Sequence, residues 1–305
     1  MKKQLPVFIF SAVILMSITS CKKSDSNPSN SSTGTLLSEF VELDTTKAVG
    51  SDTLTVTYYT YDNLKRLSTV SYIFFDNYVR DVASYNTYDL SYNGTDTLFD
   101  KSIHKLLEAG VQYDGITDTE YVSYNSDGKE IKDSVSGLNF GYQVPNGTPF
   151  ITVSNFSYNG GMVTNQQTDL GNPVSSYDTV LQTTANGNIV SQIDNNLGDS
   201  SVCTISLDTH PNPFFKNGVN VTPIFGLYED IDVDGMQDGA QKNNCLDFKK
   251  VDVTTVDALH VQNQFTYKSN GYPASVIEYN TQNFLSGYVG SNTPAFNFKG
   301  IYIYQ

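Results

Sequence analysis

The sequence predicts an all-β fold, an antiparallel up-and-down meander that forms a large curved sheet or a partial barrel. Two observations lead to this expectation. Short segments of alternating apolar and polar residues recur along the chain, and turns containing Asn, Asp or Gly separate them. The composition agrees, because the chain has 21 Tyr and 17 Phe, and aromatic residues favour strands. A helix is expected only at Ser102–Ala109, where a strand is the alternative.

The N-terminus has the features of an export signal. Lys2 and Lys3 precede an almost wholly apolar stretch from residue 5 to residue 18, which is too short to span a bilayer comfortably. The sequence Ile18-Thr19-Ser20-Cys21 follows and resembles the bacterial lipobox, whose cysteine is acylated and becomes the first residue of the mature protein. We therefore expect residues 1–20 to be a lipoprotein signal peptide and Cys21 to anchor the chain to a membrane. The alternative is an ordinary cleaved signal.

The rest of the chain divides into a tether and one domain. Residues 21–35 contain no large apolar side chain, so we expect a disordered tether, and residues 36–305 form a single β domain. Loss of residues 1–20 removes two lysines and no acid, which changes the net charge from −14 to −16. Such an acidic domain argues against nucleic acid as a partner, whereas a cation or a neutral ligand such as a glycan remains compatible.

A weak internal repeat sets the expected order of hairpins. Each copy has an alternating segment, a turn with Asn, Asp or Gly, and a second alternating segment. Asn and Gly tolerate the left-handed backbone of tight hairpins, so we expect a series of β-hairpins. The five copies are residues 59–67, 121–131, 155–163, 181–190 and 265–273, and all but the first contain Gly in the turn.

Alternation within the strands indicates a sheet with one wet face. Leu54, Val56 and Tyr58 fall on one face of the predicted strand and the threonines between them on the other. Many such strands in one sheet tend to curl, and closure removes exposed edges. The abundant tyrosines are interpreted mainly as core residues with a hydroxyl directed to water. The alternative is an exposed aromatic row that stacks on sugars or on a protein partner.

One region interrupts the hairpins. Residues from about 208 to 244 hold three prolines and an acidic run, which predicts a long excursion between strands. Within it, Asp230, Asp232, Asp234 and Asp238 have the spacing of a calcium loop, Gly235 allows the bend, and the Met236 carbonyl would add an oxygen. Gln241 stands at the position that usually holds Glu, which weakens the match. The alternative is a solvated acidic turn.

The remaining reactive residues give no catalytic pattern. Cys203 and Cys245 are the cysteines left after Cys21, and outside the cytoplasm they form either a disulfide or two thiols. His104, His210 and His260 are too far apart in the sequence for metal-type spacing. His210 lies near Asp208, but abundant serine makes an imagined triad uninformative.

The hairpin segments such as Tyr59–Leu67 resemble degenerate tyrosine–aspartate repeats of Rhs-type proteins. With the lipobox, the serine-rich tether and Asn212-Pro213-Phe214, the whole chain resembles a group of Bacteroidota lipoproteins of unknown function with a porin-like curved β-sheet. This resemblance implies an up-and-down sheet or partial barrel and no known activity. The strands lack a clear lipid-facing apolar band with aromatic girdles, so a true pore is not expected.

The functional expectation is an envelope-anchored, non-catalytic binding or structural module with a calcium loop. The membrane is its first partner through the lipid, with the outer membrane as the expected location and the face left open. A glycan or a protein is the expected ligand. The alternative is a cell-surface carbohydrate-active enzyme or a glycan-binding accessory protein.

Overall fold

A computed structural model describes the chain over twelve ranges: residues 36–81, 85–107, 116–139, 148–170, 177–186, 188–196, 199–213, 215–216, 219–220, 241–252, 258–283 and 295–305. Residues Gly34–Gln305 form one compact unit. Within the described ranges the secondary structure is all β, which confirms the predicted fold class. None of the described residues belongs to a helix long and apolar enough to cross a membrane.

The strands follow one another along the chain with mostly short connections. In order they are β1 (Leu37–Leu43), β2 (Thr53–Tyr61), β3 (Leu67–Asp76), β4 (Val79–Arg80), β5 (Tyr85–Ser91), β6 (Lys101–Leu107), β7 (Ile116–Tyr124), β8 (Glu130–Asn139), β9 (Thr148–Asn159), β10 (Met162–Asp169), β11 (Tyr177–Ala185), β12 (Asn188–Asn196), β13 (Asp199–Pro211), β14 (Phe215–Lys216), β15 (Val219–Asn220), β16 (Asn243–Asp252), β17 (Ala258–Tyr267), β18 (Pro273–Asn283) and β19 (Ala295–Tyr304). The segment Ser102–Ala109, expected as helix or strand, begins in strand β6.

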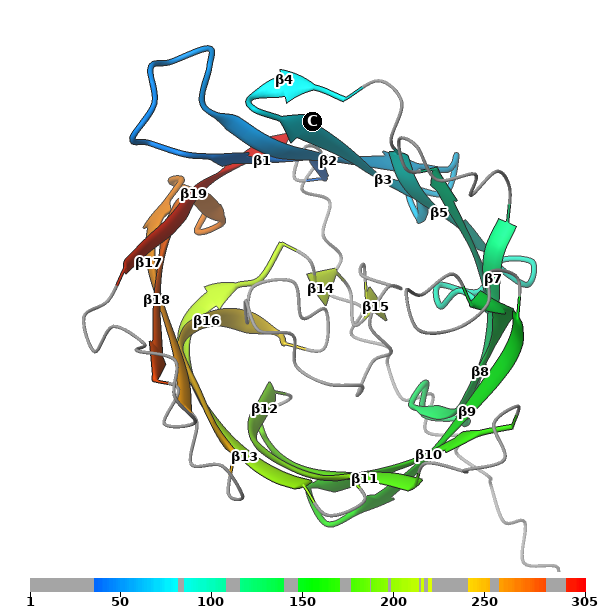
Figure 1. Cartoon of the computed structure of the whole chain (residues 1–305). Coiled ribbons are helices and arrows are strands. Elements are labelled where there is room, and N and C mark those ends of the chain that lie inside the picture. The colour runs from blue at the N-terminus through cyan, green and yellow to red at the C-terminus, as the bar shows by residue number, and fades with distance from the viewer. Residues whose placement is uncertain are drawn as a thin grey trace, which may run out of the picture. The chain divides into compact units, whose positions relative to one another are not determined.

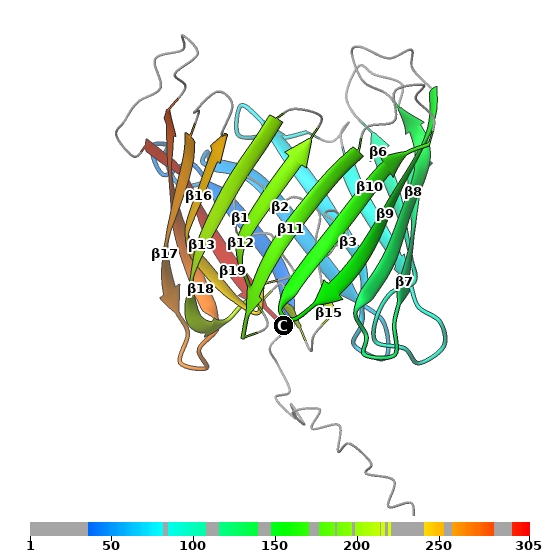
Figure 2. The ribbon, with the colours of Figure 1, turned by 90° about the horizontal axis from the view of Figure 1, so that it is seen from below.

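The main sheet curls until its first and last strands meet. Successive strands of the main sheet pair antiparallel, except that β3 pairs with both the short β4 and β5, and β1 pairs with both β2 and β19. The excursion is bypassed because β13 pairs directly with β16. Figure 1 looks along the resulting ring, and Figure 2 shows its tilted strands from the side. The short β14–β15 hairpin belongs to a separate sheet.

The tight turns gather at one end of the barrel, here called the tight-turn end. Because the meander alternates in direction, the turns 62–66, 125–129, 160–161 and 268–272 lie at the same end as the start of β1 and the end of β19. Three of these turns share one geometry. In each, the first residue donates to the carbonyl four residues later and its own carbonyl accepts from the amide three residues later, as for Asp62 with Arg66 and Lys65. The predicted hairpins are therefore present.

The fourth residue of each of these three turns has a positive φ. Gly128 and Gly271 have φ of 74° and 84°, whereas the same place in the first turn holds Lys65 with φ of 62°. Glycine adopts this conformation without a steric penalty and lysine does not. The first turn, which lacks Gly, therefore keeps the same backbone shape at a cost in conformational energy.

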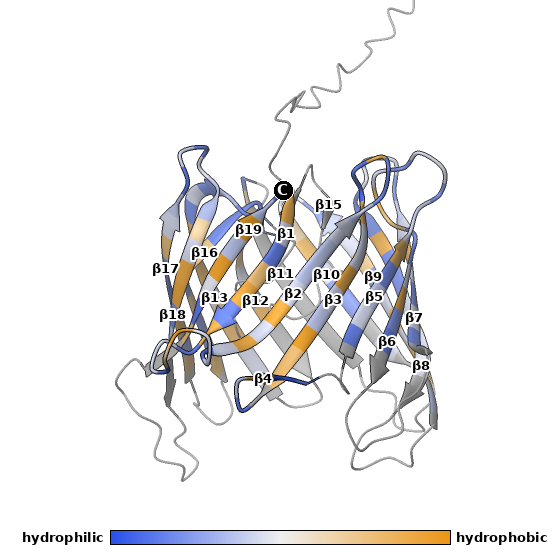
Figure 3. Cartoon of the chain, turned by 90° about the horizontal axis from the view of Figure 1, so that it is seen from above, coloured by the Kyte–Doolittle hydropathy of each residue, from blue (hydrophilic) through white to orange (hydrophobic). Residues whose placement is uncertain are grey.

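Alternate residues face the inside and the outside of the ring. In β13, Ser201, Cys203 and Ile205 are buried, whereas the residues between them are exposed. Figure 3 shows hydrophobic and hydrophilic residues interspersed along the strands. Cys203 and Ile205 pack together in one buried apolar cluster, so this set faces the inside of the ring and the exposed set faces outward.

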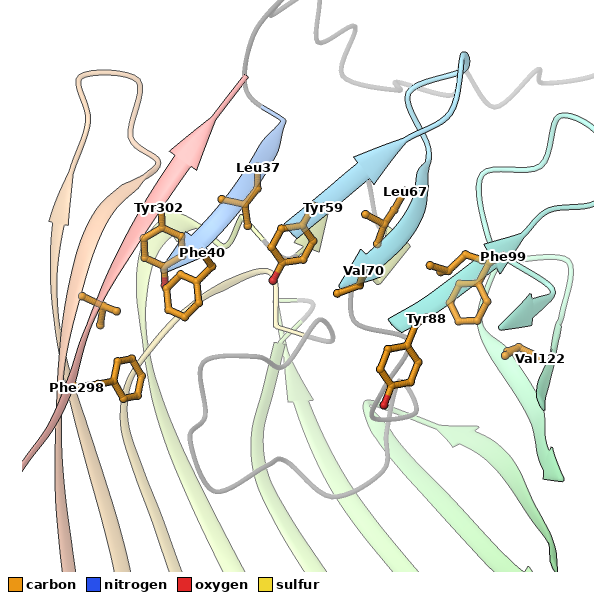
Figure 4. Close-up of a cluster of buried hydrophobic side chains, with 12 residues drawn as sticks. Leu37, Phe40, Tyr59, Leu67, Val70, Tyr88, Phe99, Val122, Phe298 and Tyr302 are labelled. Carbon is orange, nitrogen blue, oxygen red and sulfur yellow. The ribbon is translucent and has the colours of Figure 1, made fainter. Parts of the chain in front are cut away.

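Two apolar clusters occupy the inner face. The larger contains Phe40 of β1, whose ring lies 4.8 Å from that of Tyr302 and 6.5 Å from that of Phe298, centroid to centroid. Figure 4 shows this cluster extending across β1, β2, β3, β5, β7 and β19. Gly300 makes room for it, because a Cβ there would lie 2.5 Å from a ring carbon of Phe40. The smaller cluster contains Ile189, Cys203, Ile205, Cys245, Phe248 and Val261.

Candidate functional site

The base of the long excursion is closed by hydrogen bonds between its two ends, here called the neck (residues 208–213 and 241–244). The Asn212 amide donates to the Lys242 carbonyl at 3.0 Å, and the Asn212 side chain donates to the Gln241 carbonyl at 3.0 Å. Asn212 and Gln241 are both buried. The chain therefore leaves and re-enters the barrel wall at one fixed point.

Gln241 extends the sheet where the backbone ladder ends. The pairing of β12 with β13 begins at Ser191, so Ile189 lies beyond it. The Gln241 side chain accepts from the Ile189 amide and donates to the Ile189 carbonyl, both at 3.0 Å. A buried backbone group needs such a partner, and here a side chain replaces the missing strand. Asn188 and Asn243 exchange a similar pair of hydrogen bonds beside it.

Asp208 is the polar centre of the neck. One carboxylate oxygen accepts from the His210 amide at 2.9 Å and from the Asn244 amide at 3.1 Å. The other accepts from the Asn244 side chain at 3.0 Å and from the Tyr267 hydroxyl. Four donors thus meet at this one carboxyl group. Burial, followed by the bond to Asp208, raises the pKa of Tyr267, so this hydroxyl remains a donor at neutral pH.

His210 lies against this centre without completing a catalytic arrangement. Its ring stacks on Tyr267 with centroids 3.8 Å apart, and its Nδ1 lies 3.7 Å from a carboxylate oxygen of Asp208. A triad would need a nucleophile within hydrogen-bond reach of the base. The hydrogen bonds of His210 within the described residues are made by its main chain: its amide donates to Asp208, and its carbonyl accepts from Asn243 and Asn244. The arrangement fixes the neck.

Five of the predicted calcium ligands, Asp230, Asp232, Asp234, Met236 and Asp238, lie outside the described residues. Gln241 is described, and its side-chain oxygen already accepts from Ile189. A calcium ion in the predicted loop would have to share that oxygen or take its oxygens from other groups. In the parts of the chain that the structure describes, no group of three His, Cys, Asp or Glu residues is arranged to hold a metal ion.

The two cysteines face the same interior but occupy different rungs of one ladder. Cys203 lies opposite Lys250, and Cys245 lies opposite Leu207. Four residues along β13 separate these rungs, which is about 13 Å of strand. A disulfide needs Cα atoms within about 7 Å. The register therefore does not bring Cys203 and Cys245 into bonding distance, and of the two alternatives it disfavours the disulfide.

The three histidines occupy three separate places. His104 lies on the inner face, where its ring nitrogens meet Asp118 at 2.7 Å and Asn86 at 2.6 Å, and it stacks on Tyr88. His260 contacts Asp247 at 2.7 Å, on strands β17 and β16, and His210 belongs to the neck. The histidines therefore do not form a common site.

The tyrosines have a role beyond covering the core. Four hydroxyls at the tight-turn end donate to the carbonyl of the first residue of the neighbouring strand: Tyr61 to Leu37, Tyr92 to Leu67, Tyr158 to Glu130 and Tyr304 to Pro273. Three of these rings also carry a cation over one face, from Arg66, Lys129 or Lys268. In the sequence, three of the four tyrosines directly precede Asp or Asn, a signal that marks these positions.

Comparison with solved structures identifies the architecture. A porin-like protein from Bacteroides vulgatus ATCC 8482 superimposes with a TM-score of 0.51 at 9% identity, over 89% of this chain and 99% of that chain. The two proteins share a fold. A porin-like protein from Bacteroides uniformis ATCC 8492 aligns with a TM-score of 0.36 at 11% identity, over 88% of this chain and 96% of that chain. No family model and no curated protein sequence matches the chain.

Proposed function

We propose that this protein is a lipid-anchored module of the bacterial cell envelope, attached through Cys21, whose barrel stands in water and acts as a non-catalytic binding or structural unit. The lipobox and the porin-like fold support the envelope location. The neck supports the non-catalytic role, because the Asp208 carboxylate and the side chains of Asn212, Asn243 and Asn244 form hydrogen bonds that hold its two ends together.

The observation that carries this proposal is the placement of ion pairs on the outer wall. Lys105 of β6 and Asp89 of β5 both point outward, and the Lys105 Nζ lies 2.6 Å from a carboxylate oxygen of Asp89. Their side chains are 39% and 42% exposed. On the far side of the ring, Asp247 contacts His260 at 2.7 Å and Lys249 at 3.6 Å. On the lipid face of a membrane-spanning barrel, a lysine costs about 2–4 kcal/mol near the bilayer midplane and an aspartate costs less. Water is therefore the medium that suits this wall.

The packing of the inner face also supports a barrel that stands in water. A porin of about 16 strands keeps an aqueous channel lined by polar residues. Here two apolar clusters occupy part of the inner face, with Phe40, Phe248, Val70 and Val261 fully buried. Such packing provides a core for a barrel in water.

Replacement of the lipidated residue tests the proposal. A Cys21→Ser chain should lose metabolic labelling with palmitate and move from the membrane fraction to the soluble fraction after export. Retention of the variant in membranes that have been washed with alkaline carbonate would overturn the proposal, because it would indicate insertion of the barrel itself.

A further inference from the structure

Part of the inner face is polar, unlike the two apolar clusters. On β9, β10, β12 and β13 the inward positions include Ser154, Asn165, Gln192 and Ser201, all of them buried. The register places Asn165 directly opposite Phe156, whose ring is also buried on this face. Amide and hydroxyl groups beside an aromatic ring thus line this wall of the interior.

The fold does not account for the polar side chain of Asn165 inside the barrel. Its side chain is 1% exposed, and in the described structure neither its amide nitrogen nor its amide oxygen has a hydrogen-bond partner. The Ser201 hydroxyl is likewise buried without one. Buried polar groups are almost always paired, since an unpaired one loses its bonds to water and gains nothing in return. A protein that keeps such a residue is less stable than one with an apolar residue at the same place. Such a loss of stability is typical of a binding site.

We propose that Asn165, Ser201 and the ring of Phe156 line an internal binding site for a neutral, polyhydroxylated ligand, namely a short oligosaccharide. A carboxamide offers donors and an acceptor side by side, which matches neighbouring hydroxyl groups on a sugar. The Phe156 ring suits the apolar face of a sugar ring. This proposal deepens the binding role proposed above and rests on it.

The charge of the inner face and the distance between Asn165 and Ser201 limit the class of ligand. At the proposed site Asn165 offers an amide and Ser201 a hydroxyl, so recognition there would use hydrogen bonds. Buried carboxylates of Glu120 and Asp133 on the same inner surface would repel an anion. Asn165 and Ser201 are separated by β11 and β12 in the sheet, so about 14 Å lies between them at roughly 4.8 Å per strand. A short oligosaccharide spans that distance.

The test uses the full lipidated chain, purified in a detergent without a sugar headgroup, on an array of neutral and anionic oligosaccharides. The chain should retain neutral oligosaccharides. Asn165→Leu should weaken that binding at least tenfold, and Ser201→Ala should weaken it less. The matched control is Asn155→Leu on the exposed outer face of β9, which should bind as the parent does.

Stability provides a second and independent readout. If Asn165 serves a ligand, Asn165→Leu removes an unpaired buried amide and should raise the melting temperature of the ligand-free chain. A lowered melting temperature, unchanged binding by both variants, or binding of anionic oligosaccharides alone or of none would overturn the proposal. Fractionation of Cys21→Ser is unaffected by any of these results, so a failure of the glycan site is distinguishable from a failure of the anchor.

Discussion

The hydroxyl of Tyr158 in β9 donates a hydrogen bond of 2.6 Å to the main-chain oxygen of Glu130, the first residue of β8. Lys129, the residue before, places its ammonium group 4.9 Å from the centre of the same ring. Tyr92 stands in the same relation to Leu67 and Arg66. Each such tyrosine satisfies a carbonyl at the start of a strand, so the repeat fastens successive hairpins at the tight-turn end.

Removal of one tyrosine hydroxyl should weaken the barrel measurably. Tyr158→Phe leaves the Glu130 carbonyl without this donor, so we expect the free energy of unfolding to fall by about 1 kcal/mol. Urea unfolding followed by tyrosine fluorescence measures the change. Tyr58→Phe on the exposed outer face is the control and should leave the unfolding midpoint unchanged. Equal effects of the two substitutions would contradict the role assigned to Tyr158.

The first hairpin turn offers a stabilising substitution. Lys65 adopts a positive φ that the equivalent Gly128 and Gly271 adopt freely. Lys65→Gly should therefore raise the free energy of unfolding by about 1 kcal/mol. The reciprocal change, Gly128→Ala, should lower it by a similar amount in the same urea experiment. A loss of stability in Lys65→Gly would show that the lysine side chain matters more than the backbone strain.

The neck should depend on the Gln241 side chain. Gln241→Leu keeps a similar volume but leaves the Ile189 amide and carbonyl without their partners, which we expect to cost about 2–4 kcal/mol. Thermal unfolding measures the loss, and limited proteolysis should cut the variant faster. Lys242→Ala is the control, because Lys242 is exposed and contributes a backbone carbonyl. Parent-like stability of Gln241→Leu would refute the account of the neck.

The calcium loop remains a prediction that chelation can test. If Asp230–Asp238 binds calcium, EDTA should lower the melting temperature and added Ca²⁺ should restore it, since a ligand that binds the folded state stabilises it. Asp232→Asn with Asp234→Asn should abolish both responses. A parent protein whose melting curve is the same with EDTA and with Ca²⁺ would rule the site out.

The sequence predicted the strands and hairpins well because these depend on local patterns. The alternation of residues 53–58 identified a strand, but it did not identify which face is inside. The apolar set with Val56 and Tyr58 points outward, whereas Thr57 lies opposite Phe40 on the inner face. The pairing of β2 with β1 in the closed ring determines which face of β2 is inside, because it places Thr57 beside Phe40 on the inner face.

The neck could not be predicted from local patterns. Gln241 was considered as a calcium ligand because of its position after the acidic run. Its partner in the structure is Ile189, 52 residues away, and only the pairing of β12, β13 and β16 brings the two together. The cysteines illustrate the same limit, since their number allowed a bridge but the ladder register separates them.

Labelling of the outer wall tests the central claim most directly. Ser123→Cys on β7 and Thr204→Cys on β13 place single thiols at exposed outward positions on different sides of the ring, while Cys203 and Cys245 are buried. A membrane-impermeant maleimide should label both new thiols completely in isolated membranes, as fast as it does in detergent. Protection of both positions in membranes, and labelling only after solubilisation, would mean that the wall faces lipid and would contradict a water-exposed barrel held by its anchor.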